Sequence, residues 1–427
     1  MIVVDAVLAL LVVLVLGNYW LGRSVLYPPF LFCGMWILDL SLYRMELIET
    51  DPLHSNTVLL LAVGSVLFTA GGVLAMLCPE TLIAPRFVLT RFPPRNKVVK
   101  VLLIVFLFCG LPLLLRTLLG MAANGVGGTI FQRARTGGVS GDAIAGASPI
   151  LAYFVLWSFY AAPLFLIERR DKSFWVMTLI AFTAGILTTG RLPVLMLISA
   201  LTCVHLITTN RHTFRDALKF ARIPIILFLC LYFGLIFLNK DTSVYESEYS
   251  GGIAGILLYF LVSYIVGPTA ALDYFMQHPG DYAGAPHHTF KFFLGILSKL
   301  HLVYYEPATG YGTFLYVPYP MNVYTVYKDY IVDFGLYGAL IVITLIGFFQ
   351  TLLYRKARSG SELGLYFFSI TFFTVFMAAF VDLYSSFGSY IDALLFGGIY
   401  IVLRSIPLRV LPQLDSGYGA TRPDLIR

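Results

Sequence analysis

The sequence has little charge. Asp, Glu, Lys and Arg make up only 12% of its 427 residues, whereas 59% of the residues are hydrophobic and the mean hydropathy is +0.83. A water-soluble domain carries about twice that share of charged residues, so the composition excludes this class. The alternating segments of about ten residues that build a membrane β-barrel are also absent. We therefore predict an all-α, polytopic integral membrane protein.

Cysteine is scarce, and no metal-ligand spacing is present. The cysteines lie far apart and fall within or at the ends of apolar runs, which argues against a disulfide framework and against a thiolate metal site. They are Cys33, Cys78, Cys109, Cys203 and Cys230. We therefore expect neither structural disulfides nor a metal cofactor.

The sequence shows no sign of a cleaved leader peptide or of an internal repeat. Residues 2–20, IVVDAVLALLVVLVLGNYW, have no basic segment before them and no small-residue cleavage site, so we predict a retained helix. The two halves of the chain show no duplication of the kind that marks the inverted repeats of many transporters. This disfavours a transporter without excluding one.

The apolar runs that are present are long enough to cross a bilayer, which takes about 20 apolar residues. By hydropathy they predict about eleven (11–13) transmembrane helices. The candidate spans are residues 2–19, 28–45, 57–78, 99–120, 148–167, 173–189, 191–207, 223–238, 330–353, 363–381 and 387–403.

Most of the 29 basic residues fall in every second loop and in the C-terminal tail. Because loops rich in Lys and Arg remain in the cytoplasm, we predict that the N-terminus lies outside and the C-terminus inside. Sorting of basic residues by membrane side also accounts for the net charge of +6, so we expect no nucleic-acid partner.

The chain divides into four regions. Residues 1–238 form an N-terminal transmembrane bundle, which includes a Gly- and Arg-rich outer loop at 121–147. Residues 239–329 form a large outer loop region, and residues 330–404 add the last transmembrane helices. Residues 405–427 form a cytoplasmic tail, which the prolines and glycine in it predict to be poorly ordered.

The apolar run 251–275 does not fit this alternation, because both of its flanks must lie outside. We predict a re-entrant or interfacial helix, since Gly267-Pro268, Ser263 and Asp273 suit a broken helix that lines a cavity. The alternative is that this run spans the membrane together with a second span near 288–304.

Arg191 is the one Lys, Arg, Asp or Glu in the apolar run 173–207. It lies at the outer tip of a hairpin formed by two short predicted helices and begins the second of them. A helix N-terminus combined with a guanidinium favours an anion. The alternative is an arginine that reaches lipid headgroups or pairs with a carboxylate.

The glycine-rich loop 121–147 carries two further arginines, Arg133 and Arg135, on the same predicted side. Arg116 lies near the outer end of the preceding helix. Backbone N–H groups and guanidinium groups together can hold phosphate oxygens, so the four arginines predict a polyanionic ligand at the outer face. The alternative is that the loop arginines contact lipid phosphates.

The segment 276–334 is rich in tyrosine. Aromatic rings combined with hydrogen-bonding groups suit sugars, which present apolar faces and hydroxyl edges. The alternative is the aromatic belt of a membrane interface. Possible bases in this segment are His287, His288, His301, Glu306 and Asp333.

Three stretches of the chain resemble a known family. The longest is NVYTVYKDYIVDFGLYGALIVITLIGFFQTLLYRK (322–356), and the others are LTTGRLPVLML and LGRSVLYPPFLFCGMWIL. The spacing from Arg135 to Gly146 is similar to an Arg-x10-Gly element of some members. On these residues the chain resembles the bacterial oligosaccharide repeat-unit polymerases, the Wzy or O-antigen polymerase family, which are related to the O-antigen ligases.

The resemblance implies a glycosyltransferase with a bundle like that of the O-antigen ligases and of other GT-C-like enzymes. Such enzymes work in the bacterial inner membrane, on its extracytoplasmic face, and need no metal. They transfer an undecaprenyl-pyrophosphate-linked glycan onto the next lipid-linked repeat unit and release the polyprenyl pyrophosphate. A chain-length regulator and a flippase are the implied partners, together with membrane lipids.

The candidate site residues then take three roles. We expect Arg116, Arg133, Arg135 and Arg191 to hold the pyrophosphate as charge develops on it. The candidate bases are Glu306, His287 and Asp333. The candidate sugar contacts are Tyr311, Asn322, Tyr324 and Thr325, and Asp382 is a weaker catalytic candidate.

Two other functions remain open at this point. An O-antigen-ligase-type transferase would move finished glycan onto a different acceptor. A lipid-linked oligosaccharide flippase would need a cavity that opens to both sides, whereas the suggestive residues here gather on one side.

Overall fold

The computed structural model describes residues 2–48, 50–79, 97–125, 130, 133–134, 154–188, 191–211, 213, 215, 219, 222, 252–278, 286–305, 315–317, 320–321 and 323–405. Within them the chain forms twelve α-helices and one two-stranded antiparallel hairpin. The first seven helices are α1 (Ile2–Gly22), α2 (Pro28–Arg44), α3 (Ser55–Leu77), α5 (Lys97–Asn124), α8 (Ser158–Glu168), α9 (Lys172–Leu187) and α10 (Arg191–Thr208). The remaining elements are α13 (Gly252–Gln277), α14 (Lys291–Lys299), β1 (Leu315–Tyr316), β2 (Pro320–Met321), α15 (Tyr327–Arg358), α16 (Glu362–Met377) and α17 (Phe387–Ser405).

Four of these helices are long and apolar enough to cross a membrane, namely α1, α3, α5 and α15. Helices α8, α9, α10, α16 and α17 are shorter and also apolar. Ten of the eleven predicted spans overlap a helix, whereas residues 148–153 of the span 148–167 and the whole of 223–238 lie outside the described residues. The chain is therefore a helical membrane protein, as its composition predicts.

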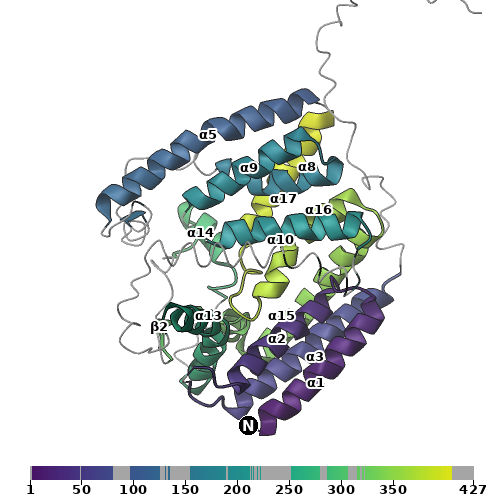
Figure 1. Ribbon diagram of the computed structural model, residues 1–427, viewed down its shortest axis with the longest axis vertical. Helices are drawn as coiled ribbons and strands as arrows, with labels where there is room; N and C mark the ends of the chain where they lie inside the picture. Colours follow the sequence, from purple (N-terminus) through teal and green to yellow (C-terminus); the bar gives the residue numbers. More distant parts are fainter. Residues whose placement is uncertain are drawn as a thin grey trace, which may run out of the picture.

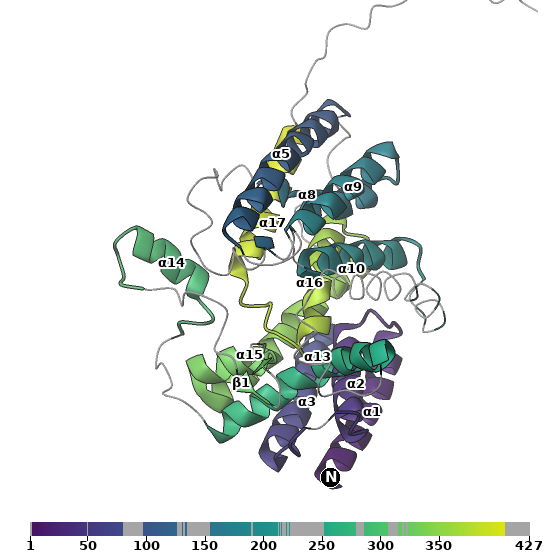
Figure 2. The ribbon, with the colours of Figure 1, turned by 60° about the vertical axis from the view of Figure 1, so that its left-hand side comes forward.

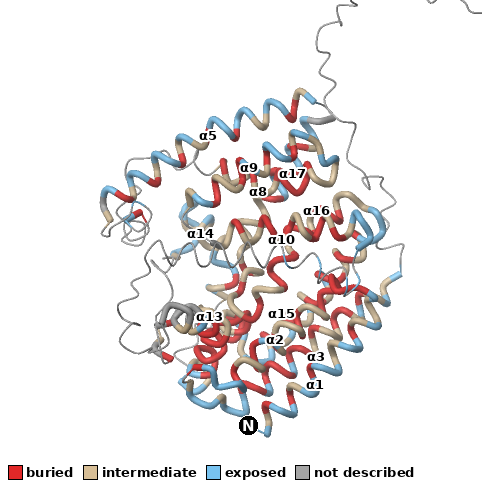
Figure 3. Tube along the Cα trace, viewed as in Figure 1, coloured by how far each residue is buried: buried red, intermediate tan, exposed pale blue. Residues whose placement is uncertain are grey.

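The helices form two neighbouring groups (Figure 1). One group contains α1, α2, α3 and α15, and the other contains α5, α8, α9, α10 and α17. Helix α16 joins them, because it contacts α15 and α2 on one side and α10 and α8 on the other. Buried residues concentrate where α2, α3 and α15 meet, whereas α1 and α5 expose apolar side chains along their outward faces (Figure 3).

One end of the bundle gathers most of the candidate residues. It is the end where α3 begins, where α5 and α9 end, and where α13, α14 and the hairpin lie (left in Figure 1). We call it the α14 end. Helix α13 is foreshortened in Figure 1 and seen along its length in Figure 2, where it crosses α2 and α3 instead of running beside them.

Helices α3 and α15 approach each other closely because glycines line their contact. A Cβ atom added at Gly71 would overlap the carbonyl oxygen of Thr344, and one added at Gly347 would overlap the carbonyl oxygen of Phe68. Small residues allow such backbone approach in membranes, where packing takes over much of the role that the hydrophobic effect has in water. This contact fixes the position of α15, and other residues of the same helix line the candidate site.

A buried ion pair fastens the second group. Lys100 Nζ lies 2.6 Å from Glu168 Oε2, both side chains are almost fully buried, and the Tyr400 hydroxyl donates to Glu168 Oε1 at 2.7 Å. The three residues belong to α5, α8 and α17, so one carboxylate links three helices. Removing one partner of such a pair leaves an uncompensated buried charge.

Substituting Gly347 tests the α3–α15 contact. We expect Gly347→Ala to lower the free energy of unfolding by about 1–3 kcal/mol, because the new methyl group has no room against the Phe68 backbone. The thermal unfolding midpoint of the detergent-solubilised protein measures the effect. Gly17→Ala on α1 is the matched control, since a Cβ there meets no atom within 4 Å. Equal midpoints for the two variants would contradict this account of the contact.

Candidate functional site

A cavity of about 360 Å³ lies between α15, α16, α17 and the turn before α14. On α15 it is lined by the apolar side chains of Val342, Leu345, Ile346, Phe349 and Leu353 and by Gln350, whose amide is hydrogen-bonded to Thr371 of α16. From Val342 to Leu353 the helix rises about 16 Å. The cavity is therefore elongated along α15 and mostly apolar.

The end of this cavity that lies toward α14 carries polar groups. Thr289 and Tyr330 line it there, whereas Gln350, Thr371, Tyr384 and Tyr390 are further polar residues of the lining. The side chain of Thr289 is buried, and its hydroxyl has no hydrogen-bond partner among the described residues. A ligand that combines an apolar tail with a polar head matches this lining.

Asp382 lies beside the polar end of the cavity, in the segment between α16 and α17. It is buried, and its Oδ1 accepts hydrogen bonds from the Tyr330 hydroxyl at 3.0 Å and from the Tyr384 backbone N–H at 2.9 Å. Its Oδ2 accepts from the Ser385 backbone N–H at 3.3 Å. Burial, reinforced by the nearby Asp329 carboxylate, raises the pKa of Asp382 to about 6, although the hydrogen bonds act in the opposite direction. Asp382 can therefore exchange a proton near neutral pH.

Asp333 holds the turn that precedes α14. Its Oδ1 accepts from the His288 backbone N–H at 3.1 Å, and its Oδ2 accepts from the Thr289 backbone N–H at 2.6 Å. Both carboxylate oxygens are thus engaged, and the side chain is only 9% exposed. In this structure Asp333, which we expected among the bases, positions the turn that lines the cavity.

A glycine two residues later changes the direction of α15. Gly335 has φ +69° and ψ 177°, which divides the helix into a short first part and a long second part. This backbone conformation is essentially restricted to glycine. The kink places Phe334 against Phe290, with ring centroids 6.5 Å apart, and so brings the turn before α14 to the cavity.

The histidines before α14 make looser contacts. The ring of His287, a predicted base, lies edge-on to the ring of Tyr305 with centroids 6.0 Å apart. His288 Nδ1 lies 3.9 Å from Asp329 Oδ1, which is too long for a hydrogen bond. Glu306, the residue after Tyr305, lies outside the described residues.

The predicted sugar contacts divide into two groups. Tyr324 and Thr325 are 8% and 1% exposed, so neither presents a surface to a glycan in this structure. Thr325 instead accepts a hydrogen bond from the Tyr327 backbone N–H at 3.4 Å at the start of α15, and the Lys328 ammonium lies 3.7 Å from the centre of the Tyr324 ring. Tyr311 and Asn322 lie outside the described residues.

Of the four predicted pyrophosphate arginines, Arg116 and Arg133 have described side chains, and both are exposed. Ala134 is buried together with Leu118 and Ala122 of α5 and packs against Leu187 at the end of α9. This contact brings the exposed Arg133 beside the tip of the α9–α10 hairpin, where Arg191 begins α10. Arg116 is exposed on α5 one turn before this cluster. Arg135 and the side chain of Arg191 lie outside the described residues.

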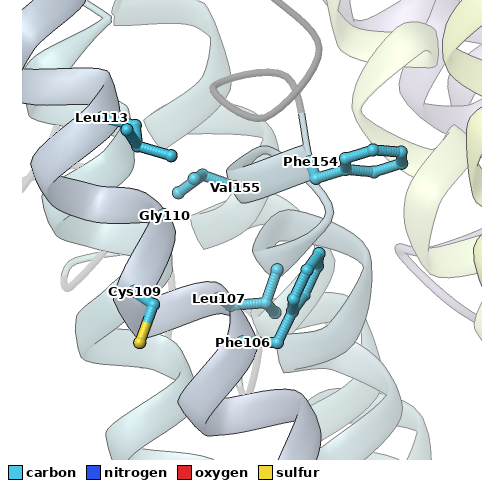
Figure 4. Close-up of a pocket in the computed structure, with 7 residues that line it drawn as sticks. All are labelled: Phe106, Leu107, Cys109, Gly110, Leu113, Phe154 and Val155. Atoms are coloured by element: carbon cyan, nitrogen blue, oxygen red, sulfur yellow. The ribbon is translucent and has the colours of Figure 1, made fainter.

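A smaller cavity of about 100 Å³ lies between α5 and residues 154–155 (Figure 4). Its lining is apolar apart from Cys109, whose sulfur points away from the other labelled side chains. With no charged or hydroxyl group in the lining, it has nothing to bind a polar ligand. It is a packing gap beside a helix with an exposed apolar face.

One pair of contacting residues at the α14 end was not predicted from the sequence. His54, at the start of α3, is hydrogen-bonded to Asp273 of α13. The available signal was a carboxylate in the apolar run 251–275, but the partner lies 219 positions away and no local pattern identifies it. In the described part of the chain no group of three or more His, Cys, Asp or Glu side chains could hold a metal ion.

Comparison with known proteins supplies no relative. No family model, no curated protein and no solved structure matches this chain.

Replacing Asp333 tests its role as the anchor of the turn. We expect Asp333→Ala to speed amide hydrogen exchange at His288 and Thr289 roughly tenfold or more, because a hydrogen bond to a charged group contributes about 1.5–3 kcal/mol. Mass spectrometry of exchanged peptides measures the change. Asp329→Asn is the matched control, because its carboxylate lies 3.9 Å from the His288 ring and accepts neither of these N–H groups. Unchanged exchange in Asp333→Ala would refute the role.

The raised pKa of Asp382 predicts a pH-dependent stability. Because the folded pKa of about 6 lies above the ordinary value of 3.8, the contribution of Asp382 to stability is fully present below pH 3.8 and is lost as the pH rises through 6. We expect Asp382→Asn to flatten the change in thermal unfolding midpoint between pH 5 and pH 7.5. Asp5→Asn, in an exposed ion pair with Arg44, should leave that change intact. A wild-type slope in Asp382→Asn would show that another group causes it.

Proposed function

We propose that this chain is a glycosyltransferase that polymerises lipid-linked oligosaccharide repeat units at the outer face of the bacterial inner membrane. Its donor and acceptor would be undecaprenyl-pyrophosphate-linked glycans. The observation that carries the proposal is the elongated cavity along α15, whose lining is mostly apolar and includes Thr289 and Tyr330 toward α14. A polyprenyl carrier would place its apolar chain along such a cavity.

The arginines at the α14 end support the same substrate class. Arg133 and the start of α10 lie together there, and the α10 N-terminus with its backbone N–H groups adds to their positive potential. Charge develops on the pyrophosphate as it leaves the sugar, so guanidinium groups would stabilise the transition state more than the ground state.

The proposed reaction is a substitution at the anomeric carbon of the donor glycan. The acceptor hydroxyl oxygen forms a bond to that carbon while the bond from the carbon to the pyrophosphate oxygen breaks. The electron pair of the broken bond leaves with the polyprenyl pyrophosphate, and the hydroxyl proton passes to a base. A nearby carboxylate such as Asp382 would favour the positive charge that develops on the donor sugar ring.

The decisive test is reconstitution. The purified full-length chain, placed in lipid vesicles with lipid-linked repeat units, should produce a ladder of polymer lengths and release polyprenyl pyrophosphate. Addition of a chelator should leave the yield unchanged. Transfer to a different acceptor without polymer would identify a ligase, and movement of the lipid across the vesicle without transfer would identify a flippase.

Substituting the arginine at the hairpin tip tests the pyrophosphate role. We expect Arg191→Lys to reduce polymer formation about 100-fold or more, because lysine cannot make the paired hydrogen bonds of a guanidinium. Arg44→Lys is the matched control, since Arg44 lies at the end of α2 in an exposed ion pair with Asp5. Gel analysis of the polymer ladder measures both. Full-length polymer from Arg191→Lys would remove Arg191 from the proposed site.

A further inference from the structure

His54 and Asp273 form a two-point contact at the α14 end. His54 is the residue before α3, and Asp273 lies on the crossing helix α13. Asp273 Oδ1 accepts the His54 backbone N–H at 3.0 Å, and Asp273 Oδ2 lies 2.9 Å from His54 Nδ1. A carboxylate that holds both the backbone and the ring of one histidine fixes the direction in which the ring points.

The two side chains differ in exposure. The side chain of Asp273 is 9% exposed, whereas that of His54 is 58% exposed. Because a carboxylate only accepts hydrogen bonds, Nδ1 must be the donor, and the neutral ring then carries its lone pair on Nε2. A histidine that takes a proton from a substrate has this arrangement. A buried carboxylate binds one ring nitrogen, and the other ring nitrogen is an exposed acceptor.

Contacts behind the pair hold α13 in place. One turn before Asp273, the Thr269 hydroxyl donates to Asp39 Oδ2 at 2.7 Å, and Asp39 is fully buried on α2. Tyr43, also on α2, donates its hydroxyl to the backbone oxygen of Asp51 in the segment that leads to His54. The position of Asp273 is therefore set by α2 as well as by α3.

Among the described residues, two other histidines at this end have no carboxylate within hydrogen-bond distance of Nδ1. His288 Nδ1 lies 3.9 Å from Asp329, beyond hydrogen-bond distance. His278 Nδ1 lies 3.1 Å from the backbone oxygen of Tyr274, which can orient the ring but carries no full charge to stabilise an imidazolium.

The helix that carries Asp273 also packs against the buried stretch before α15. Tyr324 is buried in one cluster with Tyr43 and with Val262 and Val266 of α13, so residues 323–326 adjoin the helix that carries Asp273. An oligosaccharide several sugars long, with its lipid carrier in the α15 cavity, would extend along this end of the bundle.

We propose that His54 is the base that deprotonates the attacking hydroxyl of the acceptor glycan and that Asp273 is its positioning residue. The inference rests on the proposed function. The O–H bond breaks and its proton moves to Nε2, while the oxygen bonds to the anomeric carbon and the electron pair of the departing C–O bond leaves with the pyrophosphate. Asp273 stabilises the imidazolium, which then returns its proton to water.

Asparagine at position 54 separates this role from a purely structural one. The amide nitrogen of Asn can replace Nδ1 as a donor to Asp273, but Asn has nothing at the place of Nε2. In vesicles with lipid-linked repeat units, we expect His54→Asn to polymerise about 100-fold more slowly or worse, with an unchanged thermal unfolding midpoint. We expect Asp273→Asn to lower kcat more than KM. His278→Asn is the matched control and should behave as wild type.

The outcomes separate the two proposals. If wild type polymerises and His54→Asn does so at the same rate, the assignment of His54 is overturned and the polymerase proposal stands. If wild type makes no polymer in the presence of donor and acceptor, both proposals fail.

A measurement on the wild-type protein covers the case in which the variant does not fold. Diethyl pyrocarbonate acylates neutral imidazole, and mass spectrometry locates the modified residue. We expect activity to fall in proportion to modification of His54, and lipid-linked acceptor to slow that modification. Full modification of His54 with retained polymerisation would overturn the assignment.

Discussion

A carboxylate inside an apolar helix bundle must be hydrogen-bonded or paired, and this constraint organises the described structure. Glu168 joins α5, α8 and α17, and Asp273 joins α13 to α3. Asp333 fastens the turn before α14 to α15, and Asp382 fastens the segment before α17 to the same helix. Because the chain has few charges, each of these carboxylates connects elements that are distant in sequence. Asp273, Asp333 and Asp382 thus position the α14 end.

The helices could be predicted from the sequence because each depends on a local apolar run. Ten predicted spans overlap helices, and the first of them corresponds to α1. The partners of the acids could not be predicted, since Asp333 reaches back 45 positions to His288 and Asp273 reaches back 219 positions to His54. Tyr324 and Thr325 illustrate the opposite difficulty, because a residue type that suits a sugar also suits a packed helix start.

The cavity and the surroundings of Arg133 are formed by different elements of the bundle. The cavity lies along α15, whereas Arg133 and the start of α10 lie beside the end of α5. A substrate with a long lipid, a diphosphate and several sugars can contact both, which a small soluble metabolite cannot. Under the proposed function, the size of the substrate would account for the spread of the candidate residues, from His54 before α3 to Asp382 before α17.

The kink at Gly335 also bears on how deeply α15 sits in the bilayer. Without it, the 32 residues of α15 would form a rod of about 48 Å, well beyond the hydrocarbon thickness of about 30 Å. The straight part after the kink, residues 336–358, measures about 34 Å and matches that thickness. The two turns before the kink, which bear Asp329 and Asp333, are thereby left out of that length, so a single glycine keeps both carboxylates off the straight part of the helix.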